Sequence, residues 1–293
     1  MQLIDGNFIA QKIKAEIAEK SIFVTKKYGR APHLAAVLVG NNPASEAYVR
    51  NKVKSCSEVG FRSTLIRKDA DISESELLEI IQNLNENPDI DGFIVQLPLP
   101  KHISENKVIL AIDPAKDVDG FHPTNFGKMA QGMPAFLPAT PYGILMLLER
   151  YNISTSGKHC VVVGRSNIVG TPMSILMSRK ASVGDCTVTL VHSRTQDVGA
   201  ECRRADILIA AIGIPNFIKR DMVKEGAVVI DVGINRVDDA SRPKGYKLVG
   251  DVDFEAVAPK CSYITPVPGG VGPMTVTALI MNTLQAFLNR FEA

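Results

Sequence analysis

The chain has 293 residues, of which 45% are hydrophobic and 22% are charged, so it is long enough to form two globular domains. A formal net charge of +2 gives no indication of a nucleic-acid partner or a membrane surface. The sequence has five cysteines without a CxxC pair and five scattered histidines, which predicts reduced thiols in a cytoplasmic protein and no metal site. We expect neither a signal peptide at the N-terminus nor an apolar run that spans a membrane.

The first half of the chain predicts helices that alternate with strands. The expected elements, in chain order, are helix 7–28, strand 34–39, helix 43–59, strand 63–66, helix 73–85 and strand 92–96. Strands separated by helices predict a parallel, doubly wound sheet. Ligands of such sheets bind beyond the carboxyl ends of the strands, where we expect Gly40, Gln96 and the loop 116–122 to lie.

The helix expected at 43–59 carries a lysine on its apolar side. Asn42 is suited to cap its first turn, and Gly60 is suited to the left-handed residue after its last turn. Lys52 lies one turn after Tyr48, about 40° away around the helix and inside the apolar stripe. Such a lysine covers the edge of the core with its stem, meets a buried partner, or gives up its proton because burial disfavours the charge. A structural lysine and a reactive one are both compatible with this pattern.

The second half of the chain predicts another series of the same kind, which begins with a helix from Thr140-Pro141 to Arg150. The elements expected after it are strand 159–163, helix 170–179, strand 187–191, helix 197–204, strands 206–210 and 227–230, and a final helix to about 291. We therefore predict an α/β protein with two doubly wound domains, mainly parallel sheets and a cleft between the domains. Residues 1–139 and 274–293 are expected to form one domain, and residues 140–273 a second, Rossmann-like domain.

The segment 161–170, Val-Val-Val-Gly164-Arg165-Ser166-Asn-Ile-Val-Gly, has the pattern of a dinucleotide cradle. An apolar strand, a glycine turn and a helix start place a pyrophosphate at the helix N-terminus. The segment departs from GxGxxG, because Ser166 replaces the second glycine and the closing glycine comes one residue late. A tight turn without a ligand is therefore the alternative.

The end of the next strand distinguishes between the two nicotinamide cofactors. NAD-specific domains place an acid there to hold the ribose, whereas this strand ends in His192-Ser193-Arg194. The guanidinium groups of Arg194 and Arg165 suit the 2′-phosphate of NADP. An ordinary solvated Arg194 is the alternative.

Four polar side chains are expected close to the carboxyl edge of the first sheet: Tyr48, Lys52, Gln96 and Asp119. We expect Gln96 to hydrogen-bond the amine of Lys52. Each also has a structural explanation, with Tyr48 in the core, Gln96 as a cap of the strand end and Asp119 in an Asp-Gly turn. The segment 265–275, rich in glycine and proline, allows backbone to approach a ligand or serves as a hinge.

Six motifs are specific enough to indicate a family. They are Tyr48-Val-x-x-Lys52, Gly92-Phe-x-Val-Gln96-Leu-Pro-Leu-Pro100, Lys116-Asp-Val-Asp119-Gly-Phe-His122, Gly164-Arg-Ser-x-x-Val-Gly170, Asp231-Val-Gly-Ile-Asn235 and Pro268-Gly-Gly-Val-Gly-Pro-Met-Thr275. Over essentially its whole length the chain resembles the bifunctional methylenetetrahydrofolate dehydrogenase/methenyltetrahydrofolate cyclohydrolase family. The resemblance implies oxidation of 5,10-methylenetetrahydrofolate with NADP and hydrolysis of the product to 10-formyltetrahydrofolate. It also implies a homodimer in the one-carbon metabolism that feeds purine, methionine and histidine biosynthesis.

The resemblance also implies a role for each site residue. Lys52 is the central catalytic residue of the hydrolysis, Gln96 positions it, Tyr48 stacks on the aminobenzoate ring and Asp119 binds the pterin. Pro268 and Gly269 line the folate site. It implies that Gly164, Arg165, Ser166, Ser193 and Ile234 bind NADP, and the end of the strand 187–191 adds Arg194 to this set. A monofunctional methylenetetrahydrofolate dehydrogenase and a non-catalytic nucleotide-binding protein are the alternatives; the set of Tyr48, Lys52 and Gln96 argues against the first.

Overall fold

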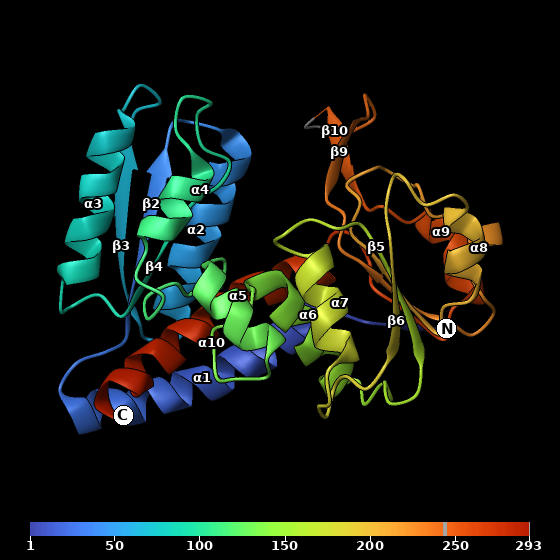
Figure 1. Cartoon of the computed structure of the whole chain (residues 1–293), viewed down its shortest axis with the longest axis horizontal. Coiled ribbons are helices and arrows are strands. Elements are labelled where there is room, and N and C mark those ends of the chain that lie inside the picture. Colours follow the sequence, from blue (N-terminus) through green and yellow to red (C-terminus); the bar gives the residue numbers. More distant parts are fainter. Residues whose placement is uncertain (243–244, 293) are drawn as a thin grey trace. The chain divides into compact units, whose positions relative to one another are not determined.

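A computed structural model describes residues 1–242 and 245–292 and divides the chain into two compact units (Figure 1). The first, here called the three-stranded unit, comprises Gln11–Ala139 and Val276–Ala293. The second, the six-stranded unit, comprises Met1–Ala10 and Thr140–Thr275. The sequence prediction grouped the first ten residues with the other unit. They join the six-stranded unit because strand β1 (Gln2–Leu3) pairs with β11 (Tyr263–Ile264).

The three-stranded unit is built around a parallel sheet of order β3-β2-β4. Its strands are β2 (His33–Val39), β3 (Arg62–Lys68) and β4 (Gly92–Val95). Every residue of the central strand β2 is buried, as expected for a strand covered on both faces. Figure 1 shows α3 on one side of this sheet and α2 on the other.

The helices of this unit follow the predicted order, with two additions. They are α2 (Pro43–Glu58), α3 (Glu74–Glu86), α4 (Glu105–Ala111), α5 (Pro123–Ala130) and most of α1 (Gly6–Tyr28) and α10 (Val271–Phe291). Ser73 caps α3, and its capping box with Glu76 is complete. The prediction missed α4 and α5. Helix α5 is capped by His122, whose Nδ1 accepts from the backbone N–H of Thr124, and histidine is not a usual cap residue.

The six-stranded unit has a parallel sheet of order β1-β11-β8-β7-β5-β6. Its further strands are β5 (His159–Val163), β6 (Thr187–Val191), β7 (Ile207–Ala210) and β8 (Val228–Asp231). Its helices are α6 (Ala139–Arg150), α7 (Gly170–Ser178), α8 (Val198–Arg203) and α9 (Phe254–Val257), with short 3₁₀ turns at Arg220–Met222 and Ala258–Lys260. The strand order reverses between β5 and β7, which is where doubly wound folds bind nucleotides.

A two-stranded antiparallel hairpin, β9 (Asn235–Asp238) with β10 (Tyr246–Val249), also belongs to this unit. The sequence prediction missed it, because neither strand is buried on one face and the apolar alternation is therefore weak.

Helix α10 is the one described helix that is long and apolar enough to resemble a membrane span, contrary to the sequence expectation. Two thirds of its most apolar stretch, 67%, is buried inside the structure, as in the core helix of a globular domain. Its C-terminal part belongs to the three-stranded unit, where Asn282 donates hydrogen bonds of 2.9 Å to the carbonyl groups of Val118 and Leu137.

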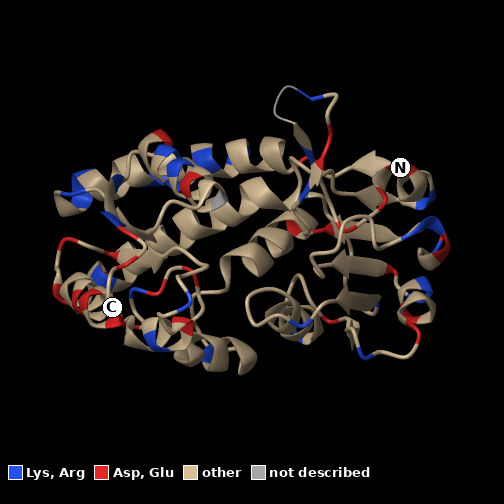
Figure 2. Cartoon of the chain, turned by 90° about the horizontal axis from the view of Figure 1, so that it is seen from above, with Lys and Arg blue, Asp and Glu red and all other residues tan. Residues whose placement is uncertain are grey.

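Figure 2 shows Lys and Arg interspersed with Asp and Glu along the helices and loops.

Candidate active site

Both ends of helix α2 are fixed by the residues that the sequence indicated. Oδ1 of Asn42 accepts a hydrogen bond of 3.2 Å from the backbone N–H of Ser45. Gly60 has a φ of 75°, and the N–H of Phe61 donates back to the carbonyl of Cys56 at 2.8 Å. These caps set where the helix begins and ends, and its apolar stripe sets which side chains point to the sheet.

Lys52 faces the interior of the three-stranded unit. The residue is 7% exposed, and its Nζ donates a hydrogen bond of 3.1 Å to Oε1 of Gln96. Arg50 and Lys54 of the same helix are exposed, so the lysine at position 52 is distinguished by the side of the helix it occupies. A lysine that only covers the core with its stem keeps its amine in water. The amine of Lys52 instead has a side-chain partner inside the protein.

Gln96 is held in turn by the end of the sheet. Its backbone N–H donates to the carbonyl of Val37 at 2.9 Å, which continues the pairing of β4 with β2. Its side-chain Nε2 donates to the carbonyl of Leu97 at 2.7 Å. With the amide nitrogen engaged in this way, the amide oxygen faces Lys52.

Tyr48 and Asp119 complete the set in the three-stranded unit. Tyr48 is half-buried one turn before Lys52, and burial raises the pKa of its phenol, which keeps the hydroxyl protonated. Burial likewise raises the pKa of the Asp119 carboxyl, while the charge of Lys52 acts in the opposite direction. Asp119 therefore lies within electrostatic range of Lys52, as the sequence analysis expected for the carboxyl edge of the sheet.

A second acid, which the sequence analysis did not single out, fixes the loop that carries Asp119. The buried carboxylate of Asp117 accepts hydrogen bonds from the backbone N–H groups of Phe121 and His122 and from the Asn125 side chain, at 2.8 to 3.2 Å. Desolvation raises its pKa to about 6, although these hydrogen bonds oppose the rise. Asp117 is thus a structural residue, which leaves the carboxylate of Asp119 to face the site.

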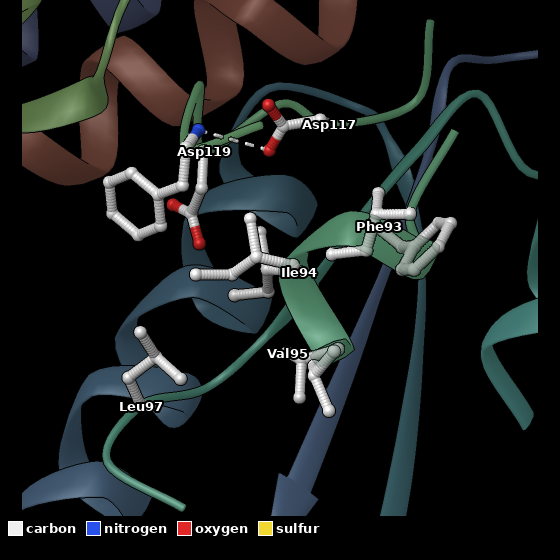
Figure 3. A pocket seen from close by; sticks show the side chains of 10 residues that line it. Phe93, Ile94, Val95, Leu97, Asp117 and Asp119 are labelled. Carbon is white, nitrogen blue, oxygen red and sulfur yellow. Dashed lines mark hydrogen bonds between the residues drawn. The ribbon is translucent and has the colours of Figure 1, made fainter. Parts of the chain in front are cut away.

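Asp119 lines a small pocket beside β4 (Figure 3). The pocket has an accessible volume of about 10 Å³, roughly enough for one water molecule. Figure 3 shows the Asp119 carboxylate directed away from Asp117, whose oxygen is bonded to backbone. The remaining lining is mostly apolar, from Phe93, Ile94, Val95, Leu97, Val108, Ile109, Ile112 and Phe121.

In the six-stranded unit, the turn after β5 has the close backbone packing of a nucleotide cradle. Gly164 has a φ of 114°, and a Cβ at this position would lie 2.8 Å from the carbonyl carbon of Ala211. A Cβ at Gly170, the first residue of α7, would lie 2.8 Å from the backbone nitrogen of Arg165. Ser166 occupies the place of the second glycine and accepts from the N–H of Val169 at 3.2 Å. Only glycine fits at both ends of this turn.

The two arginines predicted for the cofactor follow neighbouring strands. Val163 pairs with Val191 in register, so Arg165 and Arg194 leave adjacent strands at the same edge of the sheet. Arg165, Ser193 and Arg194 are all exposed there. Over residues 1–242 and 245–292, neither arginine forms an ion pair with a carboxylate within 4.0 Å. Both guanidinium groups are therefore available to an anionic ligand.

Ile234, the last predicted cofactor residue, is one of three exposed isoleucines in loops among the described residues of this unit. Ile168 follows β5, Ile214 follows β7 and Ile234 follows β8, with exposures of 45%, 46% and 46%. These three strands are neighbours in the sheet. Ile168 and Ile214 were not predicted from the sequence. The signal that could have identified them is a large apolar residue shortly after a buried strand.

Pro268 and Gly269 also lie in the six-stranded unit, whereas Tyr48, Lys52, Gln96 and Asp119 belong to the other. The N-terminus supports their loop. The N–H of Asn7 donates to the carbonyl of Gly269 at 3.1 Å, and a Cβ at Gly6 would lie 2.6 Å from the carbonyl carbon of Gly270. Across the part of the chain that the structure describes, no three His, Cys, Asp or Glu side chains gather as a metal site.

Two family models match the chain, one for each half. The catalytic domain of tetrahydrofolate dehydrogenase/cyclohydrolase matches residues 4–119. The NAD(P)-binding domain of tetrahydrofolate dehydrogenase/cyclohydrolase matches residues 138–291.

Individual proteins match over the full length. The chain is 63% identical to the bifunctional protein FolD of Flavobacterium johnsoniae over 98% of this chain and 97% of that protein. The crystal structure of the bifunctional FolD of Campylobacter jejuni is 46% identical, with a TM-score of 0.93 over 99% of both chains. The Trypanosoma brucei enzyme, solved with NADP cofactor and inhibitor, is 37% identical, with a TM-score of 0.94 over 99% of this chain and 98% of that one.

Proposed function

Because this chain belongs to the tetrahydrofolate dehydrogenase/cyclohydrolase family, we propose that both reactions of the family take place on it. The enzyme oxidises 5,10-methylenetetrahydrofolate to the 5,10-methenyl compound with NADP and hydrolyses that product to 10-formyltetrahydrofolate. The observation that carries the proposal is the partly buried hydrogen bond between Lys52 and Gln96, in a chain that also has a glycine-lined nucleotide turn.

The residues of the six-stranded unit fit NADP. The turn at Gly164 and Gly170 has no room for a Cβ, as expected where backbone closes around a pyrophosphate. Arg165, Ser193 and Arg194 offer hydrogen-bond donors to a 2′-phosphate, and Ile234 offers apolar contact. NADP, when bound, accepts the hydride from the one-carbon bridge.

The residues of the three-stranded unit fit the folate and the hydrolysis. Tyr48, whose burial keeps the phenol protonated, stacks on the aminobenzoate ring, and the Asp119 carboxylate accepts hydrogen bonds from the pterin. The methenyl compound is a cation, so a neutral Lys52 amine is a better neighbour for it than an ammonium group. Lys52 then takes a proton from the water that attacks the methenyl carbon. The carbon–N5 bond of the resulting carbinolamine breaks, its hydroxyl proton passes to N5, and the formyl group stays on N10. Gln96 holds the amine in place.

The two activities of the purified protein test this proposal directly. We expect NADP to be reduced when methylenetetrahydrofolate is added, and the methenyl absorbance to fall faster than in buffer. Reduction without faster methenyl decay would indicate a monofunctional dehydrogenase. Absence of both activities would indicate a non-catalytic nucleotide-binding protein.

The choice of cofactor is tested by the two arginines. We expect Arg165→Ala and Arg194→Ala each to raise the KM for NADP by about tenfold, the loss of one charged hydrogen bond, with little change in the KM for NAD. Arg203→Ala, on helix α8, is the control for loss of an exposed arginine from the same unit. Equal increases in the KM for NADP and the KM for NAD would contradict contact between these arginines and the 2′-phosphate.

We also propose that the enzyme is a cytoplasmic homodimer whose products feed purine, methionine and histidine biosynthesis. All five cysteines are free and buried, which suits a reducing compartment. The dimer rests on the family resemblance, and its test is the mass of the protein in solution by light scattering. A monomer at micromolar concentration would contradict it.

A further inference from the structure

Two buried aspartates of the six-stranded unit lie outside every role described so far. Asp231, the last residue of β8, is 3% exposed, and Asp251, which follows β10, is 0% exposed. No described lysine or arginine forms an ion pair with either carboxylate. Buried carboxylates are costly unless hydrogen bonds replace the lost water, so the partners of these two need an explanation.

Asp231 is bonded to backbone on two segments. Its Oδ1 accepts from the N–H groups of Gly233 at 3.0 Å and Asp251 at 2.9 Å, and its Oδ2 accepts from Val252 at 2.9 Å. Desolvation raises the pKa of Asp231 to about 6 in spite of these three donors. The carboxylate thus ties the turn after β8 to the segment after β10.

Asp251 reaches two further segments. Its Oδ2 accepts from the N–H groups of Ile212 at 2.7 Å and Gly213 at 2.8 Å, in the turn after β7. Its Oδ1 accepts from Nδ2 of Asn235 at 2.9 Å, at the start of the β9–β10 hairpin. One carboxylate therefore holds the turn after β7 and the base of the hairpin together.

Two glycines show that this packing is close on both sides. A Cβ at Gly233 would lie 2.5 Å from Cγ of Asp251, and a Cβ at Gly250 would lie 2.8 Å from Oδ1 of Asp231. Each acid thus packs against a glycine of the segment that carries the other. We refer to Asp231, Asp251, Gly233 and Gly250 as the carboxylate clamp.

The place of the clamp in the sheet indicates what it serves. The sheet order β8-β7-β5-β6 puts Arg194 after β6 at one side and the pyrophosphate turn after β5 in the middle. An extended dinucleotide with its 2′-phosphate at β6 therefore places its nicotinamide half over the ends of β7 and β8. Those ends carry Ile214 and Ile234, and each lies next to a residue that the clamp holds, Gly213 or Asn235.

We propose that Asp231 and Asp251 are positioning residues that hold the turns after β7 and β8 in the shape required by the nicotinamide half of NADP. This inference rests on the proposed dehydrogenase function. Neither acid touches the cofactor: both act through the backbone next to Ile214 and Ile234. The adenosine half, held by Arg165, Ser193 and Arg194, is outside their reach.

The clamp is tested by comparing whole and half ligands on the full-length protein. For Asp251→Asn and Asn235→Ala we expect the Kd of NADP, measured by calorimetry, to rise by about tenfold, as for the loss of one charged hydrogen bond. The Kd of 2′,5′-ADP, which lacks the nicotinamide half, should stay within about twofold. Asp238→Asn, an exposed acid of the same hairpin, is the control and should change neither.

The two activities give an independent readout. In the same variants we expect kcat/KM of the dehydrogenase to fall by about tenfold or more, while hydrolysis of methenyltetrahydrofolate without NADP stays at the wild-type rate. A general loss of folding would lower both activities and the thermal midpoint together. Equal weakening of NADP and 2′,5′-ADP, or wild-type NADP affinity in both variants, would overturn the proposal. Absence of both activities from the wild-type protein would instead refute the proposed function.

Discussion

Replacing Gly164 by alanine tests the nucleotide turn at the point where its backbone packs most closely. The residue has a φ of 114°, a sparsely populated backbone conformation that costs a residue with a Cβ about 1–3 kcal/mol. The new Cβ would also lie 2.8 Å from the carbonyl carbon of Ala211 and closer still to its oxygen, inside the 3.0 Å that real Cβ atoms keep. Overpacking of this kind costs a further 1–3 kcal/mol or so.

The backbone around Gly164 has little freedom to relieve this overlap. The N–H of Ala211 donates to the carbonyl of Val163, and the N–H of Gly164 donates to the carbonyl of Val191, both at 2.8 Å. The strain therefore falls on the turn that we assign to the pyrophosphate. If about 2 kcal/mol of it appears in binding, the Kd of NADP rises by roughly 30-fold.

Two further glycines separate the causes of this loss. Gly170 does not have a positive φ, but its Cβ would lie 2.8 Å from the nitrogen of Arg165, so Gly170→Ala should weaken NADP binding similarly. Gly157 has a φ of 71° with nothing within 4 Å of its Cβ position, so Gly157→Ala should cost about 1 kcal/mol of stability and leave the Kd unchanged. Calorimetry with NADP and thermal unfolding measure both effects. Wild-type affinity in Gly164→Ala would refute the assignment of this turn.

The remaining predictions concern the stability of the three-stranded unit. Arg30 donates two hydrogen bonds, of 2.6 and 2.8 Å, to the fully buried carboxylate of Asp91, so Arg30→Met should destabilise the unit by about 3–5 kcal/mol in urea denaturation. A loss below about 1 kcal/mol would contradict the ion pair's structural role. Asp117 has a pKa of about 6 in the folded protein against an ordinary value of 3.8, so the folded state binds its proton more tightly than the unfolded state does. The stability that this proton contributes is complete below about pH 4 and is lost as the pH rises from about 4 to about 6. The stability of Asp117→Asn relative to wild type should therefore increase over this range, by up to about 3 kcal/mol, and a difference that does not change with pH would be inconsistent with the shift.

The position of Lys52 was predictable from sequence because the rotation of α2 follows from local signals. Asn42 and Gly60 set the helix ends, and the apolar stripe sets the buried side. Gln96 was predictable as its partner because it directly follows a strand, and strand ends of a parallel sheet share one edge. These inferences need only neighbouring residues and a sheet of known type.

The structural acids were not predictable in the same way. The hydrogen bonds of Asp251 to Ile212 and Gly213 span 39 and 38 residues, and no local pattern indicates them. The pairing of β1 with β11 joins two strands of two residues each from distant parts of the chain. Such short, non-local pairs leave no periodic signal, so the membership of the first ten residues became clear only from the structure.

The role of Lys52 is the central claim, and Lys52→Met tests it most directly. The substitution keeps a side chain of similar length and removes the amine that Gln96 holds. Lys54→Met, on the exposed side of the same helix, is the matched control and should retain both activities. We expect Lys52→Met to hydrolyse methenyltetrahydrofolate no faster than buffer while it binds NADP with wild-type affinity. Hydrolysis at the wild-type rate by Lys52→Met would contradict the account.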